Sequence, residues 1–179
     1  MEKKIILSAQ LLEITMSRLA QELVENHQDF KQTVLIGLQP RGIFFAEKIK
    51  QKLLELQTQP IELGYLDVTF YRDDFRRRDA PLKPNATKMD FIIEDKKVVV
   101  IDDVLFTGRT IRAALDAMIA FGRPQSVELL ALIDRKYTRN LPIQPNYIGR
   151  EVNTLASQWI QVEWTEQGHT ENNIWLVEK

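Results

Sequence analysis

A run of apolar residues that leads into two adjacent carboxylates and a short Thr/Gly loop is the part of the chain best suited to chemistry. Val98–Ile101 is apolar and β-branched, and Asp102 and Asp103 follow it directly. The next loop contains Thr107-Gly108-Arg109-Thr110. Carboxylates accept hydrogen bonds from sugar hydroxyls, whereas hydroxyls, a glycine and the free amides of a helix start suit a phosphate. The pattern therefore predicts a site for a sugar phosphate.

Two other phosphate-binding motifs do not occur in the chain. A Walker P-loop needs Gly-x-x-x-x-Gly-Lys before Ser or Thr, and dinucleotide folds need Gly-x-Gly-x-x-Gly. Neither spacing is found among the seven glycines. An ordinary turn or helix cap is the alternative for the two carboxylates, since Asp is common at such positions.

Alternating strands and helices are expected to position this loop. The periodicity predicts helices at Ala9 to about Asp29, Gly42 to about Leu56 and about Gly108 to Phe121. Strands are predicted at Thr33–Leu38, Ile61–Tyr71, Val98–Asp103 and Val127–Ile133. After Asp134 the chain is expected to be irregular and then to end in a hairpin of Trp159–Trp164 and Ile174–Val177. The alternation is typical of an α/β fold with a doubly wound, mostly parallel sheet flanked by helices, and such sheets bind ligands beyond the carboxyl ends of their strands.

Composition limits the classes of function. The 179 residues fit one domain, 1–179, and the formal net charge of −1 gives no overall signature of nucleic-acid or membrane binding. The chain has no cysteine, which excludes disulfides and thiolate metal sites. No apolar run is long enough for a membrane span or a signal peptide, so we expect a cytoplasmic protein with no membrane partner.

The stretch from Ile101 to Thr110 resembles, position by position, the signature of the type I phosphoribosyltransferases. In that family an apolar strand ends in two acidic residues and runs into Thr-Gly-x-Thr. The resemblance implies that Asp102 and Asp103 bind the ribose hydroxyls of phosphoribosyl pyrophosphate. It also implies that the sugar 5-phosphate lies against the residues that follow, which are Val104, Leu105, Phe106, Thr107, Gly108, Arg109 and Thr110.

The loop after the Thr33–Leu38 strand resembles the pyrophosphate loop of the same family. Pro40 would lower the cost of the cis peptide that the family often has there. By resemblance, Arg41 neutralises the charge of pyrophosphate and Gly42 begins the next helix. An ordinary turn is the alternative interpretation of this loop.

A charged, proline-containing excursion runs from Arg72 to Asn85. It resembles the flexible lid of the family, which implies catalytic roles for Tyr71 and Arg72 at its start. A solvated charged surface is the alternative, especially for Arg76–Arg78.

Two later segments, Ala131–Arg135 and Leu141–Arg150, resemble the PyrR branch of the family. Members of this branch are uracil phosphoribosyltransferases that also regulate pyrimidine operons by transcription attenuation. By that resemblance Arg135 faces the carbonyl edge of the base, and Tyr147 and Ile148 contact the base. The alternative is that Tyr147 and Ile148 are only part of a strand core.

The resemblance implies transfer of phosphoribose from phosphoribosyl pyrophosphate to uracil, which gives UMP and pyrophosphate. Mg²⁺ is expected as the cofactor, held mainly through phosphoribosyl pyrophosphate and not by a dedicated protein site. Phe106 stands where purine-using relatives commonly carry a carboxylate, which favours a pyrimidine. The family also implies a homo-oligomer. A purine phosphoribosyltransferase and a regulatory nucleotide-sensing protein with little catalysis are the alternatives.

Binding of leader RNA is left open by the sequence. The PyrR branch usually carries Asp-Arg-Gly-His-Arg-Glu-Leu-Pro in a stretch that contributes to RNA binding, whereas residues 134–142 are one residue longer and lack Gly-His-Arg. Basic residues outnumber acidic ones between Arg123 and Arg150, which allows a local phosphate-binding face. RNA is therefore a candidate partner that depends on this altered stretch.

Overall fold

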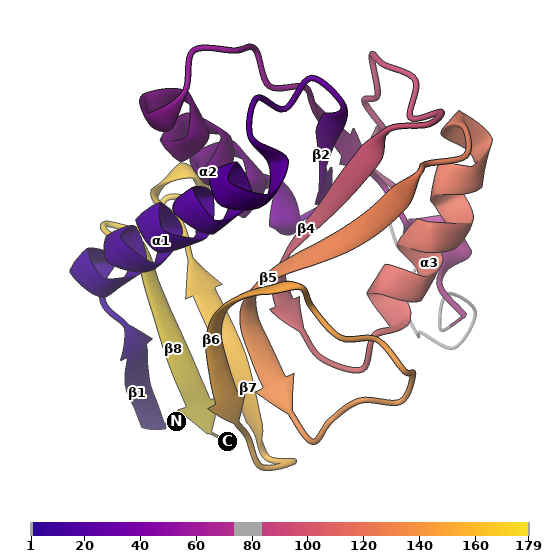
Figure 1. Ribbon diagram of the computed structural model, residues 1–179. Helices are drawn as coiled ribbons and strands as arrows, with labels where there is room; N and C mark the ends of the chain where they lie inside the picture. The colour runs from indigo at the N-terminus through magenta and orange to yellow at the C-terminus, as the bar shows by residue number, and fades with distance from the viewer. Residues whose placement is uncertain (1, 74–83, 179) are drawn as a thin grey trace.

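A five-stranded parallel sheet forms the centre of the computed structural model, which describes residues 2–73 and 84–178 (Figure 1). The strand order is β3-β2-β4-β5-β6. The strands are β2 (Thr33–Leu38), β3 (Leu63–Leu66), β4 (Lys97–Leu105), β5 (Ser126–Lys136) and β6 (Tyr147–Asn153). The order reverses between β2 and β4, and such a reversal is where open α/β sheets bind ligands.

Helices cover both faces of this sheet, as the doubly wound prediction requires (Figure 1). Val99 and Ile101 of β4 pack in the same core cluster as α1 (Ala9–His27) and α2 (Gly42–Leu56). Val98 and Val100 point to the other face and pack with α3 (Arg109–Met118). Successive side chains of a strand face opposite sides, so a segment buried on both faces is a continuous apolar run. The run Val98–Ile101 has this pattern, which is why the sequence predicted a strand there.

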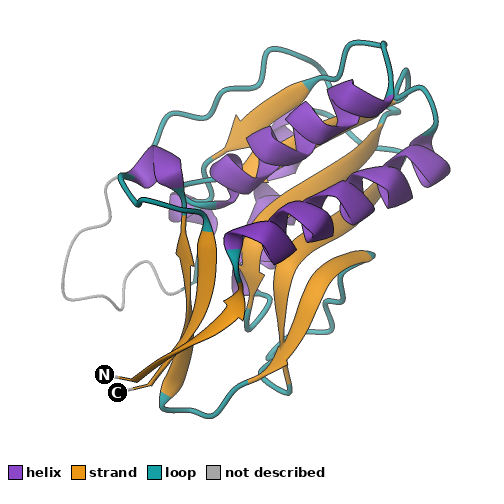
Figure 2. Cartoon of the chain, turned by 90° about the vertical axis from the view of Figure 1, so that its left-hand side faces the viewer, coloured by secondary structure: helices purple, strands orange, loops and turns teal. Residues whose placement is uncertain are grey.

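A small antiparallel sheet joins the two ends of the chain. Its order is β1-β8-β7, formed by β1 (Glu2–Leu7), β7 (Gln158–Glu163) and β8 (Asn173–Glu178). Figure 2 shows the N- and C-termini side by side at this sheet. The predicted C-terminal hairpin is confirmed, and β1 is an additional strand that pairs with β8.

Two predicted strand ends are wrong. β3 is only Leu63–Leu66, because its pairing with β2 extends over four residues, and a 3-10 turn follows at Thr69–Tyr71. β4 continues past the carboxylates to Leu105, because β5 extends beside it as far as Asp134 and provides backbone partners. Asp102 and Asp103 therefore lie inside the last part of the strand.

Two further boundaries differ from the prediction. α3 ends at Met118 and passes into a 3-10 turn at Ile119–Phe121 before Gly122, whose φ is 127°. Tyr147–Asn153 forms β6, although the sequence after Asp134 predicted irregular structure. β6 is an edge strand with several exposed polar residues, so it lacks the apolar run that marks a buried strand. Within the described part of the chain, no helix is long and apolar enough to cross a membrane.

Candidate active site

A cleft of about 270 Å³ lies at the carboxyl end of the central sheet. The loop after β2, the end of β4, the first turn of α3, the end of β5 and the strand β7 all contribute side chains to it. Many of the predicted site residues line this one cleft: Pro40, Arg41, Arg72, Asp102, Asp103, Val104, Phe106, Thr110 and Arg135. The fold thus brings together residues that lie almost a hundred positions apart in the sequence.

The carboxylate pair is almost completely buried at the floor of the cleft. Asp102 is 8% exposed and Asp103 is 6% exposed. The amide of Asp103 donates to Oδ1 of Asp102 at 3.0 Å, and Arg41 Nε lies 3.1 Å from Asp103 Oδ2 as an ion pair. Within the described residues, no group donates a geometrically satisfactory hydrogen bond to Asp103 Oδ2. This oxygen is an acceptor that the described residues leave unused, and almost none of its surface is exposed to solvent.

The pKa values of the two carboxyls differ from those of ordinary surface aspartates. Burial raises the pKa of Asp102 well above its usual value, and the neighbouring Asp103 raises this pKa further. Burial also raises the pKa of Asp103, although Arg41 opposes this change. The protein therefore holds two acidic groups where their negative charge is costly, an arrangement typical of functional sites.

The loop after β2 lies directly against this pair. Gln39-Pro40 is a cis peptide bond, and α2 begins at Gly42. A Cβ on Gly42 would lie 2.8 Å from the carbonyl oxygen of Ile101 and 3.0 Å from Asp102 Oδ1. Only glycine allows the loop to approach this closely. The position expected for a pyrophosphate loop is thus adjacent to the position expected for the ribose.

The Thr/Gly loop connects β4 to α3 at the edge of the cleft. Gly108 adopts a left-handed conformation with φ of 89°, which lets the chain turn into the helix at Arg109. Thr110 lines the cleft, whereas Thr107 lines a neighbouring hollow and Arg109 forms an ion pair with Asp73. The first amides of α3 have no partner within the helix, as at any helix start, and can serve an anion.

Of Tyr71 and Arg72, the two residues predicted at the start of the lid, only Arg72 lines the cleft. Its Nη1 donates to Thr110 Oγ1 at 3.3 Å. Tyr71 is 44% exposed, and its carbonyl accepts from Arg112 Nη2 at 3.0 Å. The structure therefore does not bring the Tyr71 ring to the cleft. Most of the predicted lid, including Arg76–Arg78, lies outside the described residues.

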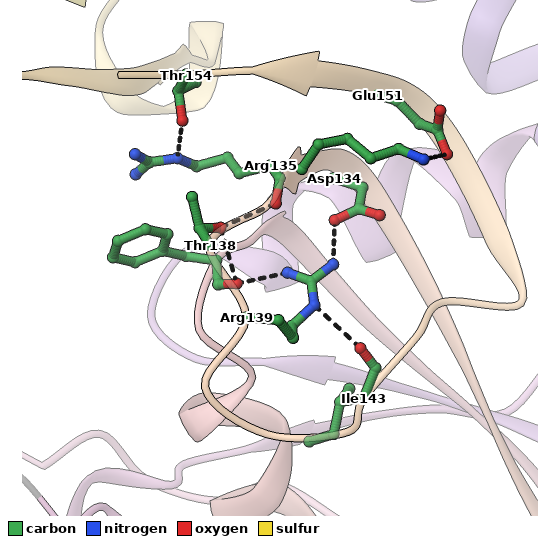
Figure 3. A network of polar contacts seen from close by, with 9 residues as sticks. Asp134, Arg135, Thr138, Arg139, Ile143, Glu151 and Thr154 are labelled. Atoms are coloured by element: carbon green, nitrogen blue, oxygen red, sulfur yellow. Dashed lines mark hydrogen bonds and ion pairs between the residues drawn. The ribbon is translucent and has the colours of Figure 1, made fainter. Parts of the chain in front are cut away.

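Aromatic and cationic groups form the other end of the cleft. The guanidinium of Arg135 lies 4.0 Å from the centre of the Phe106 ring. Arg135 Nε donates to Thr154 Oγ1 at 3.0 Å (Figure 3), and Nη2 donates to the carbonyl of Gln158 at 3.0 Å. These bonds fix a planar cation above an aromatic ring.

Trp159 and Ile160 of β7 also line this end of the cleft. The sequence indicated that they belong to a hairpin strand but gave no sign of their function. Their place at the cleft depends on how the small sheet docks onto the central one.

Tyr147 and Ile148 do not line this cleft, which corrects the expectation that they contact the base. Tyr147 is the first residue of β6, at the amino end of the strand, whereas the cleft lies at the carboxyl end of the sheet. Tyr147 is 5% exposed. Its hydroxyl donates to Glu128 Oε2 at 2.7 Å. The carbonyl of Ile148 accepts from Arg18 Nη2 of α1 at 3.0 Å. The alternative of a structural role holds for the Tyr147 ring.

Comparison with known proteins places the chain in a family. The sequence model described as "Phosphoribosyl transferase domain" matches residues 2–167. The chain belongs to the phosphoribosyltransferase family. Within it, the chain is 36% identical over 172 residues to "Bifunctional protein PyrR" of Bacillus velezensis, covering 95% of this chain and 94% of that protein. It is 40% identical over 167 residues to "Bifunctional protein PyrR" of Desulfosudis oleivorans, covering 93% and 92%. The predicted PyrR branch is confirmed.

Solved structures show the same fold. The hypoxanthine phosphoribosyltransferase of Trypanosoma cruzi superimposes with a TM-score of 0.74 at 14% identity, covering 98% of this chain and 96% of that chain. A hypoxanthine phosphoribosyltransferase of Staphylococcus aureus gives 0.71 at 17% identity, covering 96% and 90%. At these identities the likeness concerns architecture alone, and it confirms the predicted phosphoribosyltransferase fold.

The acidic side chains of this phosphoribosyltransferase could supply only some of the ligands of a Mg²⁺ ion. Within the described residues, no group of three or more His, Cys, Asp or Glu side chains is placed to hold a metal. Asp102 and Asp103 offer hard oxygen donors, and Mg²⁺ usually keeps waters and substrate phosphate oxygens as its other ligands. The donor set therefore fits a cation that arrives with a diphosphate.

The basic side chains of residues 134–142 are bonded to the protein itself. Lys136 pairs with Glu151 at 2.7 Å, Arg139 pairs with Asp134, and Arg135 donates to Thr154 and Gln158. Tyr137, in contrast, is 90% exposed.

Proposed function

We propose that the chain is a uracil phosphoribosyltransferase, which forms UMP and pyrophosphate from uracil and phosphoribosyl pyrophosphate. One observation carries the proposal. A single cleft joins a buried carboxylate pair, a cationic loop beside it and an aromatic, cationic end, which match a ribose, a diphosphate and a base in that order. The PyrR relatives named above support the choice of a pyrimidine.

At the ribose, Asp102 and Asp103 would accept hydrogen bonds from the two hydroxyls. Ionised carboxylates accept without donating, so they hold hydroxyl donors well. Their charge would also stabilise the positive charge that develops on the sugar as the bond to pyrophosphate breaks. The role of the pair is to orient and stabilise the sugar.

At the leaving group, Arg41 and Arg72 would bind the diphosphate. Both line the cleft, and Arg41 is already within ion-pair distance of Asp103. Mg²⁺, when bound with the substrate, supplies further neutralisation of the diphosphate charge. Asp102 and Asp103 are the residues that would face it.

At the base, Arg135 and Trp159 would recognise uracil. Arg135 Nη1 makes no hydrogen bond within the described residues, so this donor is available to a carbonyl oxygen of the ring. Trp159 offers a flat surface for stacking. Phe106 has no group that accepts a proton from a purine N7, which favours uracil over hypoxanthine.

The assay that tests this proposal is product formation from uracil, phosphoribosyl pyrophosphate and Mg²⁺. We expect UMP, with hypoxanthine a poor competitor. A preference for hypoxanthine would favour the purine alternative. Absence of any product would favour a nucleotide-sensing regulator.

Regulation of pyrimidine genes through leader RNA is the second candidate function, because the relatives named above are called bifunctional. Most basic side chains of the altered stretch bind the protein itself, so an RNA site there would rely on Tyr137 and on charge that is already partly neutralised. A filter-binding titration against a pyrimidine-operon leader tests it. Absence of salt-dependent affinity would exclude this function.

The proposal includes a homo-oligomer, as the family implies. Leu11 and Ile14 are 48% and 60% exposed on α1, an apolar surface that a second copy would cover. Light scattering after size-exclusion chromatography would contradict this if it gave the mass of a single chain.

A further inference from the structure

The segment after β5, residues 137–143, is bonded to the phosphate-binding loop between β4 and α3 (Figure 3). The carbonyl of Phe106 accepts a hydrogen bond from Arg139 Nη1. The carbonyl of Thr107, the next residue, accepts from the amide of Asn140 at 3.0 Å. Two consecutive carbonyls of the loop are thus held by one neighbouring segment.

Arg139 is the main side-chain donor to the Phe106 carbonyl. Thr138 Oγ1 also lies 3.2 Å from this carbonyl, but it lies closer, at 2.9 Å, to the carbonyl of Arg135. A hydroxyl has one proton to donate, so Thr138 serves one acceptor at a time. Only Arg139 can hold the Phe106 carbonyl continuously.

The guanidinium of Arg139 bonds three acceptors in three directions (Figure 3). Nη1 reaches Phe106, Nη2 pairs with the carboxylate of Asp134 at the end of β5, and Nε donates to the carbonyl of Ile143 at 3.0 Å. Asp134 is 5% exposed, so its charge is buried and needs this partner. A planar fork of five N–H donors can make this set of bonds, whereas a lysine ammonium at one point in space cannot.

Apolar side chains of the same segment lie beside the glycine turn of the loop. A Cβ on Gly108 would lie 3.3 Å from Ile143 Cδ1 and 3.6 Å from Leu141 Cβ, so there is no room for a larger residue to turn towards the segment. The 137–143 segment is therefore bonded to the phosphate-binding loop at residues 106 and 107 and lies next to residue 108.

These contacts determine where the amides of the loop point. A trans peptide unit is planar, and its carbonyl and its N–H point in opposite directions. Because the carbonyls of Phe106 and Thr107 face the 137–143 segment, the amides of Thr107 and Gly108 face away from it. Donors fixed before the ligand arrives bind an anion more tightly than donors that must first be ordered.

We propose that Arg139, anchored by Asp134, is a positioning residue for the site that binds the 5-phosphate of the sugar. It holds the amides of Thr107 and Gly108 in place and does not touch the substrate. The choice of ligand rests on the proposed function. Arg139 then affects the affinity for 5-phosphorylated ribose and leaves the affinity for pyrophosphate and the KM for uracil unchanged.

Isothermal titration calorimetry with ribose 5-phosphate tests this proposal directly. Arg139→Gln should weaken binding about tenfold, the loss expected when one charge-assisted hydrogen bond to the loop is removed. Arg139→Lys should weaken it by a similar factor, because it keeps the charge without the forked donors. Binding of pyrophosphate with Mg²⁺ should stay at the wild-type affinity in both variants. Arg123→Gln, an exposed arginine before β5, removes the same charge and should change neither affinity.

Three results would overturn the proposal. Wild-type affinity of Arg139→Gln for ribose 5-phosphate would show that the loop needs no such anchor. Full rescue by Arg139→Lys would show that only long-range charge matters. Equal loss of pyrophosphate binding in a variant with a wild-type circular dichroism melt would show a general effect on the cleft.

Asp134→Asn provides a second variant if Arg139→Gln does not fold. It should weaken ribose 5-phosphate binding in the same way, and the two changes together should cost less than their sum, because both act through one contact. Additive losses would contradict the proposal. If the wild-type protein binds ribose 5-phosphate but forms no UMP, the proposed function fails while the role of Arg139 is still decided by these titrations.

Discussion

Replacing Asp103 with asparagine should separate activity from stability. The amide keeps the size of the carboxylate but removes its charge from a position that is 6% exposed. It also removes the ion pair with Arg41 Nε, at 3.1 Å. We expect kcat/KM for UMP formation to fall sharply while the fold stays intact.

The expected effect on folding is small. The Arg41 side chain is 47% exposed, so solvent screens the pair, and such pairs contribute about 0–1 kcal/mol. Burial raises the pKa of Asp103 above its unfolded value, so its contribution to stability is present at low pH and is lost as pH rises through the folded pKa. Near neutral pH the asparagine amide stays uncharged, so the variant does not lose the stability that wild type loses when the buried carboxyl ionises. Asp103→Asn should therefore unfold within about 1 kcal/mol of wild type, or be more stable.

The expected effect on catalysis is large. A hydrogen bond to a charged group contributes about 1.5–3 kcal/mol, which corresponds to a fall of about tenfold to 150-fold in kcat/KM. Steady-state assays of UMP formation and urea unfolding curves measure the two quantities. Asp116→Asn is the matched control, because Asp116 lies on α3 and pairs with Arg112 at 3.4 Å on the surface. Near-normal turnover of Asp103→Asn, with the control unchanged, would refute the role given to the carboxylate.

Three further variants test other parts of the account. Trp159→Ala should raise the KM for uracil by about tenfold, since base stacking on an aromatic ring contributes about 1–3 kcal/mol, and an unchanged KM would exclude contact with the base. Tyr147→Phe should lose about 1 kcal/mol of stability by removing its bond to Glu128, and a raised KM for uracil would restore the role expected from sequence. Burial lowers the pKa of His27 below its ordinary value of 6.5, so wild-type stability should fall as pH drops through 6.5 towards the folded pKa. The urea midpoint of His27→Gln should change less with pH in that range than the midpoint of wild type. If both midpoints change equally, other titratable groups cause the pH dependence.

The elements buried on both faces could be predicted from sequence. The central runs Val34–Ile36 of β2 and Val98–Ile101 of β4 are apolar because α1 and α2 cover one side of the sheet and α3 covers the other. The carboxylates and the Thr/Gly loop were found because their residue types are specific and contiguous. Local sequence therefore located the end of the cleft to which we assign the sugar and the phosphate.

The end to which we assign the base could not be predicted in the same way. It is formed where β7 of the small sheet meets Arg135 of the central sheet, and no local pattern records this docking. β6 was missed because an edge strand needs no apolar run. Tyr147 was expected at the base from the family resemblance alone, whereas its hydroxyl is bonded to Glu128 inside the fold.

The buried acidic pair and the loop after it are expected to bind a phosphorylated ribose. Calorimetric titration with phosphoribosyl pyrophosphate and Mg²⁺ tests it most directly, on the wild-type protein and on the double variant Asp102→Asn, Asp103→Asn. We expect wild type to bind phosphoribosyl pyrophosphate saturably. The double variant should unfold like wild type but bind this ligand with strongly weakened affinity. Absence of binding to the wild type, or equal affinity in both proteins, would contradict it.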